Sequence, residues 1–236
     1  MAESTYILVH GAWGGAWYWS EVGAELTRRG ANWTALDLPS STHGAHPNTF
    51  LADDAHEVIE VAKLEGPVIL VGHSYGGAVI TEAADRVPSL ERLIYIAALV
   101  PNLGQSTTEA TRDVDVRTLL DDAIESDGEY LRLNPRLAAA ALYQDCPDDV
   151  AARAVASLSS QTIASLRSPR SAFDSGAPSF YVRCNLDQTI DPSLQDVMAT
   201  RCDEVATLES GHCPMLSMPA TLCDLLLSSA LRENQP

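Results

Sequence analysis

A serine stands between two glycines at residues 72–76, in the order Gly-His-Ser-Tyr-Gly. The short, apolar and β-branched residues 67–71 predict a strand before it, and residues 78–84 predict a helix after it. A strand, a sharp turn and a helix with serine at the turn form a nucleophile elbow, in which a strained backbone lifts the serine Oγ clear of the sheet. Side chains in place of the two glycines would crowd that turn. We therefore expect Ser74 to be a catalytic nucleophile; the alternative is a plain turn that contains a serine.

Strands and helices alternate along most of the chain. The expected strands are residues 5–10, 33–37, 67–71, 92–98, 179–184 and 204–208, and the expected helices are residues 16–29, 50–64, 78–84 and 219–231. This alternation predicts an α/β fold, with a mostly parallel, doubly wound sheet and helices on both faces. The strand at 5–10 lacks strict alternation of polar and apolar residues, so we expect it inside the sheet.

Residues 101–178 interrupt this pattern with helical stretches and no strand suited to the central sheet. The clearest helical segments are residues 111–125, 135–143 and 147–158. An insertion that follows a strand end lies beside the carboxyl edge of the sheet, where ligands bind in such folds. We expect residues 1–100 and 179–236 to form the core and residues 101–178 to form a helical cap, or lid; the alternative is an ordinary surface subdomain.

Composition excludes several classes of partner. The 236 residues fit one domain with a sizeable core, since 46% of them are hydrophobic. The net charge of −17 argues against nucleic acid and anionic membranes as partners. No apolar run is long enough for a membrane span, and residues 1–5 lack the basic region of a signal peptide.

Cysteine and histidine usage favours a cytoplasmic protein without a metal. The five cysteines are odd in number and fit no zinc spacing, so we expect them to be reduced. His43 and His46 share one loop, but no Cys, Asp or Glu stands near them at a metal-ligand spacing. We expect no metal and no cofactor.

The order of residues along the chain predicts a serine hydrolase triad. A serine hydroxyl needs a neighbouring base, and the base needs an orienting acid. Ser74, Asp187 and His212 follow the order Ser, Asp, His, and each stands at or just beyond an expected strand end. Asp191 is the alternative acid, but with Pro192 after it this residue can cap a helix.

The glycine-rich segment at residues 11–15 follows the first expected strand. No Gly-Lys-Ser/Thr signature follows it, so we exclude phosphate binding. Backbone N–H groups of such a loop can approach a ligand. We expect the backbone N–H groups of Ala12 and of Tyr75, the residue after the nucleophile, to form an oxyanion hole. Cys213 is an alternative nucleophile beside His212, but no elbow presents it.

Six stretches resemble the plant methylesterase and hydroxynitrile lyase branch of the α/β-hydrolases and its bacterial esterase relatives. They are residues 9–19, 36–39, 72–77, 142–149, 181–187 and 211–216, in the order of that family. The resemblance implies the α/β-hydrolase fold, the triad Ser74, Asp187 and His212, and a cap at about residues 101–178. Related proteins are often dimers, so a homodimer is expected by analogy.

The resemblance also bears on the substrate pocket. The lyase members carry Thr after the first-strand His and Lys after the catalytic His, and these residues bind the substrate hydroxyl and stabilise departing cyanide. Here Gly11 and Cys213 occupy those positions, and neither can do that work. We expect Gly11, Trp13 and Cys213 to border the pocket of an esterase.

Three functions remain open from the sequence. We favour a serine hydrolase that cleaves small, largely apolar carboxylic esters through an acyl-enzyme. The second is a lyase, cyclase or decarboxylase of a biosynthetic pathway on the same scaffold. The third is a binding protein that kept the fold, against which an intact triad argues.

Overall fold

The structure is a computed structural model of the chain, and it describes residues 4–231. The prediction about a signal peptide falls mainly on residues 1–3, which lie outside the described part, as do residues 232–236. Within the described part, no helix is both long and apolar enough to cross a bilayer. None of the five cysteines forms a disulfide.

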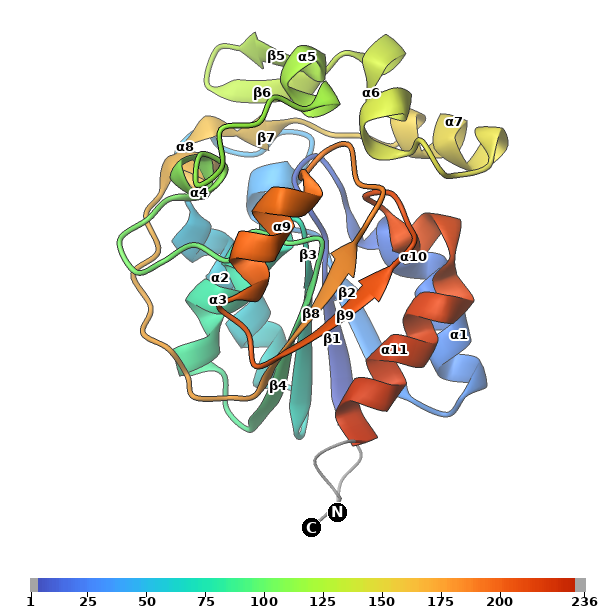
Figure 1. The fold of residues 1–236 in the computed structure, drawn as a ribbon. Helices are drawn as coiled ribbons and strands as arrows, with labels where there is room; N and C mark the ends of the chain where they lie inside the picture. The colour runs from blue at the N-terminus through green and yellow to red at the C-terminus, as the bar shows by residue number, and fades with distance from the viewer. Residues whose placement is uncertain (1–3, 232–236) are drawn as a thin grey trace.

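A six-stranded parallel sheet forms the centre of the molecule (Figure 1). Its strands are β1 (Thr5–Val9), β2 (Asn32–Leu36), β3 (Val68–His73), β4 (Leu90–Ile96), β8 (Ser179–Cys184) and β9 (Glu204–Leu208). They are ordered β2-β1-β3-β4-β8-β9, and every neighbouring pair is parallel. The predicted α/β fold and the interior position of β1 are confirmed.

Helices cover both faces of the sheet. The helices that flank it are η1 (Ala16–Trp19), α1 (Ser20–Arg28), η2 (Pro39–Ser41), α2 (Leu51–Ala62), α3 (Tyr75–Ala83), η3 (Ala84–Arg86), α9 (Pro192–Ala199), α10 (Pro214–Ser217) and α11 (Pro219–Leu231). Figure 1 shows α1 and α11 together on one face and α2 and α3 together on the other. The helix expected at 16–29 is real, but its first turn is the 3-10 helix η1.

Residues 101–178 contain short helices and a second, antiparallel sheet. Their elements are α4 (Thr107–Ala110), α5 (Leu119–Ala123), β5 (Ile124–Asp127), β6 (Tyr130–Leu133), α6 (Pro135–Leu142), α7 (Asp148–Ala156), β7 (Gln161–Thr162) and α8 (Ile163–Arg167). The small sheet is ordered β5-β6-β7. Figure 1 shows α5, β5, β6, α6 and α7 lying over one end of the central sheet. The helices expected at 135–143 and 147–158 are confirmed.

The expectation of a purely helical insertion, with one helix at 111–125, was wrong. The helix α4, which a capping box begins at Ser106, already ends at Ala110, and a second capping box at Thr118 begins α5 inside that stretch. After α5 the chain forms β5, and the two residues Gly128 and Glu129, with Gly128 at φ 62°, turn it back into β6. These two strands are short, β5 is mostly exposed and β6 is mostly half-buried, so only their pairing, and not an apolar pattern, identifies them.

Candidate active site

Ser74 lies in the sharp turn between β3 and α3. Its backbone has φ 54° and ψ −120°, a left-handed conformation that is strained for a residue other than glycine. A Cβ on Gly72 would lie 2.5 Å from the Gly76 carbonyl oxygen, and a Cβ on Gly76 would lie 2.6 Å from the His10 carbonyl oxygen. Both glycines are therefore needed for the close approach of the two backbones, and the expected strained turn is confirmed.

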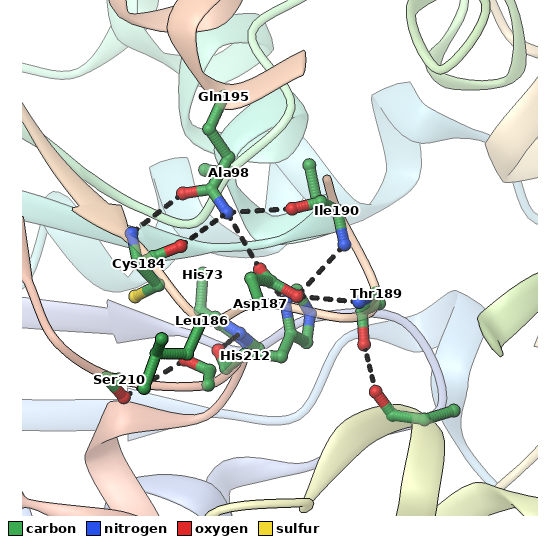
Figure 2. A network of polar contacts seen from close by, with 12 residues as sticks. His73, Ala98, Cys184, Leu186, Asp187, Thr189, Ile190, Gln195, Ser210 and His212 are labelled. Atoms are coloured by element: carbon green, nitrogen blue, oxygen red, sulfur yellow. Dashed lines mark hydrogen bonds and ion pairs between the residues drawn. The ribbon is translucent and has the colours of Figure 1, made fainter. Parts of the chain in front are cut away.

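His212 and Asp187 meet although 25 residues separate them. Asp187 follows β8 and His212 follows β9, so neighbouring parallel strands deliver both residues to the same edge of the sheet. The imidazole donates from Nδ1 to Asp187 Oδ2 over 2.8 Å, and both residues are buried (Figure 2). Nδ1 is thus the protonated nitrogen, which leaves Nε2 to accept a proton.

Ser74 directly follows β3 and lies at the same edge of the central sheet. His73, its neighbour, donates from Nε2 to the His212 carbonyl oxygen over 2.9 Å, and the two rings lie 4.6 Å apart between centroids. Within residues 4–231, neither Ser74 Oγ nor His212 Nε2 has a hydrogen-bond partner. Hydrogen bonds between a nucleophile and its base are often loose before substrate binds.

Asp187 accepts hydrogen bonds from several donors besides His212. Its Oδ1 accepts from the backbone N–H groups of Thr189, over 2.7 Å, and Ile190, over 3.0 Å. Its Oδ2 also accepts from Gln195 Nε2 over 2.9 Å. Hydrogen bonds to both oxygens fix the orientation of the carboxylate toward His212.

Gln195 was not singled out in the sequence. This fully buried side chain on α9 donates to the Ile190 carbonyl oxygen, over 2.8 Å, and accepts from the Cys184 backbone N–H, over 2.9 Å (Figure 2). It therefore ties the end of β8 to the loop that carries Asp187. The signal in the sequence was a polar residue beside Leu194, on the buried face of a helix.

We expect the substitution Gln195→Leu to lower the free energy of unfolding by about 2–4 kcal/mol, because it leaves buried backbone groups without partners. Urea denaturation followed by circular dichroism measures this loss. Gln188→Leu is the matched control, since Gln188 is exposed in the loop that carries Asp187. Equal losses in the two variants would show that the network around Gln195 adds nothing to stability.

Asp191, the alternative acid, has the structural role that its sequence context predicts. It is the N-cap of α9 and accepts from the Ser193 backbone N–H over 2.8 Å, with Pro192 in the first turn. The structure brings Asp187, and not Asp191, to His212.

The other two histidines near the elbow are not free to act as bases. His10 donates from Nδ1 to the Gly11 carbonyl oxygen and accepts at Nε2 from the Leu38 backbone N–H. Burial lowers the pKa of His10 to about 4. Burial, and then the neighbouring His212, lowers the pKa of His73 well below its usual value. Both rings are therefore neutral at pH 7.

Cys213 cannot easily supply a thiolate. The residue is fully buried, and burial raises the pKa of its thiol well above the usual value. A neutral, buried thiol is a structural residue rather than a nucleophile.

A cavity of about 640 Å³ opens beside Ser74. Its apolar lining residues include Leu99, Leu120, Ile124, Leu131, Leu166 and Leu194. Ala12, Trp13 and Tyr75 line it together with the serine, so the two residues expected to supply the oxyanion donors border the same cavity. Tyr75 is the first residue of α3, where a backbone N–H has no partner within the helix. Of the three expected pocket residues, Trp13 lines this cavity, whereas Gly11 and Cys213 do not.

Gly11 and Cys213 are instead covered by neighbouring residues. A Cβ on Gly11 would lie 2.9 Å from the Ser74 Cβ, so this glycine allows the loop to pack against the elbow. Cys213 has no exposed surface.

The stretch at residues 142–149 contacts both the loop that carries Asp187 and the loop that carries His212. Gln144 donates from Nε2 to the Leu186 carbonyl oxygen over 2.9 Å, next to Asp187. Asp145 accepts from the Gly211 backbone N–H over 2.7 Å, next to His212. This stretch between α6 and α7 therefore contributes to the geometry of the site.

Comparisons with known proteins agree with the fold described above. The profile of the alpha/beta hydrolase family matches residues 6–225. The esterase PIR7B of rice, Oryza sativa subsp. japonica, is 30% identical over 262 residues, which cover 97% of this chain and 96% of that protein. The carbendazim hydrolyzing esterase of Nocardioides sp. (strain SG-4G) is 39% identical over 110 residues, which cover only 44% of this chain and 45% of that protein.

A solved structure supports the fold. The pyrethroid hydrolase of Sphingobium faniae JZ-2 superimposes with a TM-score of 0.85 at 23% identity, covering 97% of this chain and 98% of that one. At this identity the match shows the fold alone. The resemblance to plant esterases is confirmed by the rice relative. The family profile spans most of the sequence, and the chain therefore belongs to the alpha/beta hydrolase family.

Proposed function

We propose that this protein is a serine esterase that hydrolyses largely apolar carboxylic esters through Ser74, His212 and Asp187. The observation that carries the proposal is the buried 2.8 Å hydrogen bond between His212 Nδ1 and Asp187 Oδ2, at the same sheet edge as the strained Ser74. This bond sets the imidazole tautomer that a serine nucleophile needs. The relatives named as esterases support the same chemistry.

The proposed reaction has two halves. Ser74 Oγ attacks the ester carbonyl while His212 Nε2 takes its proton, and Asp187 stabilises the resulting imidazolium. The backbone N–H groups of Ala12 and Tyr75 hold the oxyanion, and His212 then gives the proton to the departing alkoxide. Water, deprotonated by His212, hydrolyses the acyl-enzyme by the same steps in reverse order.

The insertion is proposed to act as a cap over this site. Residues of α5, β5 and β6 line the cavity together with Ser74, although they lie outside the central sheet. A cap of this kind excludes water from the reacting ester and selects the substrate by shape. We propose residues 101–178 as its boundaries. We also propose a cytoplasmic location, which the five unpaired cysteines support.

The apolar lining predicts a preference for longer ester chains. Each methylene buried in the cavity contributes about 0.8 kcal/mol, so kcat/KM for p-nitrophenyl esters should rise up to about fourfold per methylene from acetate to hexanoate. The substitution Leu120→Trp, which fills part of the cavity, should flatten this rise. Leu137→Trp is the control, because Leu137 is exposed and lies outside the lining. A flat wild-type series would contradict binding of the chain in this cavity.

A further inference from the structure

A carboxylate without a cation is buried behind the elbow. Asp54, on α2, has no exposed surface. Its Oδ2 accepts from the Tyr75 hydroxyl over 2.6 Å and from Ser40 Oγ over 2.5 Å, and its Oδ1 accepts from the Ser40 backbone N–H over 2.9 Å. Within residues 4–231, no basic side chain pairs with it. Burying a carboxylate in this way costs stability, so its presence calls for a role other than packing.

The same group of hydrogen bonds continues to the loop after β1. Ser40 Oγ accepts from Gln161 Nε2 over 2.8 Å. Gln161 Oε1 in turn accepts from the Trp13 backbone N–H over 3.3 Å. Gln161 is fully buried on β7, within the insertion. Asp54 is therefore connected to Tyr75 directly and to the peptide between Ala12 and Trp13 through two side chains.

We propose that Asp54 is a positioning residue that holds both donors of the oxyanion hole. This inference rests on the proposed function, which assigns the backbone N–H groups of Ala12 and Tyr75 to that role. One arm of the network fixes the Tyr75 side chain, and the other fixes the loop beyond Ala12. Oxyanion donors act through preorganisation, so a small displacement of either one reduces stabilisation of the transition state more than binding of the substrate.

The test compares Asp54→Asn and Tyr75→Phe with Asp53→Asn, whose carboxyl group is exposed on the same helix. With p-nitrophenyl butyrate, Asp54→Asn should lower kcat by about 10- to 100-fold, with KM within about twofold of wild type. A trifluoromethyl ketone with the same acyl chain forms a tetrahedral adduct with an oxyanion. Its inhibition constant should rise by the same factor as kcat falls. Tyr75→Phe should change both in the same direction, and Asp53→Asn should change neither.

A pH profile gives a second readout that a merely structural role would not move. Burial raises the pKa of Asp54 to about 6, although hydrogen bonds from Ser40 and Tyr75 oppose the rise. The titratable groups that act on it are the phenol of Tyr75, which donates a hydrogen bond to it, and the exposed carboxyl of Asp53, the preceding residue of α2, which raises its pKa slightly. At pH 7 and above Asp54 is mostly ionised, and at pH 5 it is mostly neutral, like asparagine. The ratio of wild-type kcat to Asp54→Asn kcat should therefore be largest above pH 7 and fall toward one as the pH drops to 5.

Each outcome decides a separate point. A folded Asp54→Asn with wild-type kcat and ketone affinity, or with a lower melting temperature as its only change, would overturn this inference alone. If Asp54→Asn does not fold, an unchanged Tyr75→Phe would overturn it. A wild type that neither hydrolyses the ester nor binds the ketone would overturn the proposed function and this inference with it.

Discussion

Replacing Ser74 by alanine is expected to lower kcat/KM for p-nitrophenyl butyrate by about 10⁴- to 10⁶-fold. The variant lacks the only oxygen that the elbow presents to the ester carbonyl, so no acyl-enzyme can form. The free energy of unfolding should not fall, because alanine keeps the contacts of the backbone and Cβ around the turn. Ser74 Oγ itself has no hydrogen-bond partner within residues 4–231. Steady-state turnover and labelling by a fluorophosphonate probe measure the loss.

Ser228→Ala is the matched control, because Ser228 is exposed on α11, far along the chain from the site. It should keep wild-type turnover and labelling. If the wild type turns over no ester and its serine is not labelled, Ser74 is not an activated nucleophile. The lyase, cyclase, decarboxylase or binding alternatives would then take the place of the esterase.

Replacing Asp187 by asparagine is expected to lower kcat by about 10³- to 10⁴-fold while the protein stays folded. The backbone N–H groups of Thr189 and Ile190 need an acceptor, so the amide oxygen should take the place of Oδ1. The amide NH₂ would then face His212 Nδ1. The imidazole would have to carry its proton on Nε2, where it cannot accept the proton of Ser74.

Asp191→Asn separates this effect from a general loss of negative charge. Asparagine caps a helix as well as aspartate does, so α9 should keep its start and turnover should stay within about threefold of wild type. Measuring kcat for the two variants side by side decides between the two carboxylates. If Asp191→Asn loses activity and Asp187→Asn does not, the assignment of the acid is wrong.

Some of the site could be predicted because its signals are local. The glycines at 72 and 76 are required by contacts across a single turn, and the Asp191–Pro192 pair is a complete helix start. Apolar runs bounded by polar loops identified the six strands of the central sheet. The inner strands β1, β3, β4 and β8 are largely buried on both faces, whereas the edge strands β2 and β9 are partly exposed.

Other parts could not be predicted because they depend on pairing between distant segments. The strands β5 and β6 are short and only partly buried, so nothing in their composition distinguishes them from a helix or a loop. Gln195 and Asp54 each occupy a polar position on the buried face of an amphipathic helix. That pattern signals a buried polar group, but it does not tell which partner satisfies it.

By itself, then, the sequence determined the succession of strands and helices along the chain, the strained serine and the set of candidate acids and bases. Propensities, turns and caps act over a few residues, so these features have local signals. The sequence favoured Asp187 over Asp191, and the tertiary structure decided that Asp187 meets His212. It also decided that residues 101–178 contain a small sheet and that Asp54 lies against the Tyr75 hydroxyl. These outcomes depend on the order of the strands within the sheet and on packing between elements far apart in the chain. The hydrogen bond of under 3 Å between His212 and Asp187 joins two such residues, which no local pattern relates.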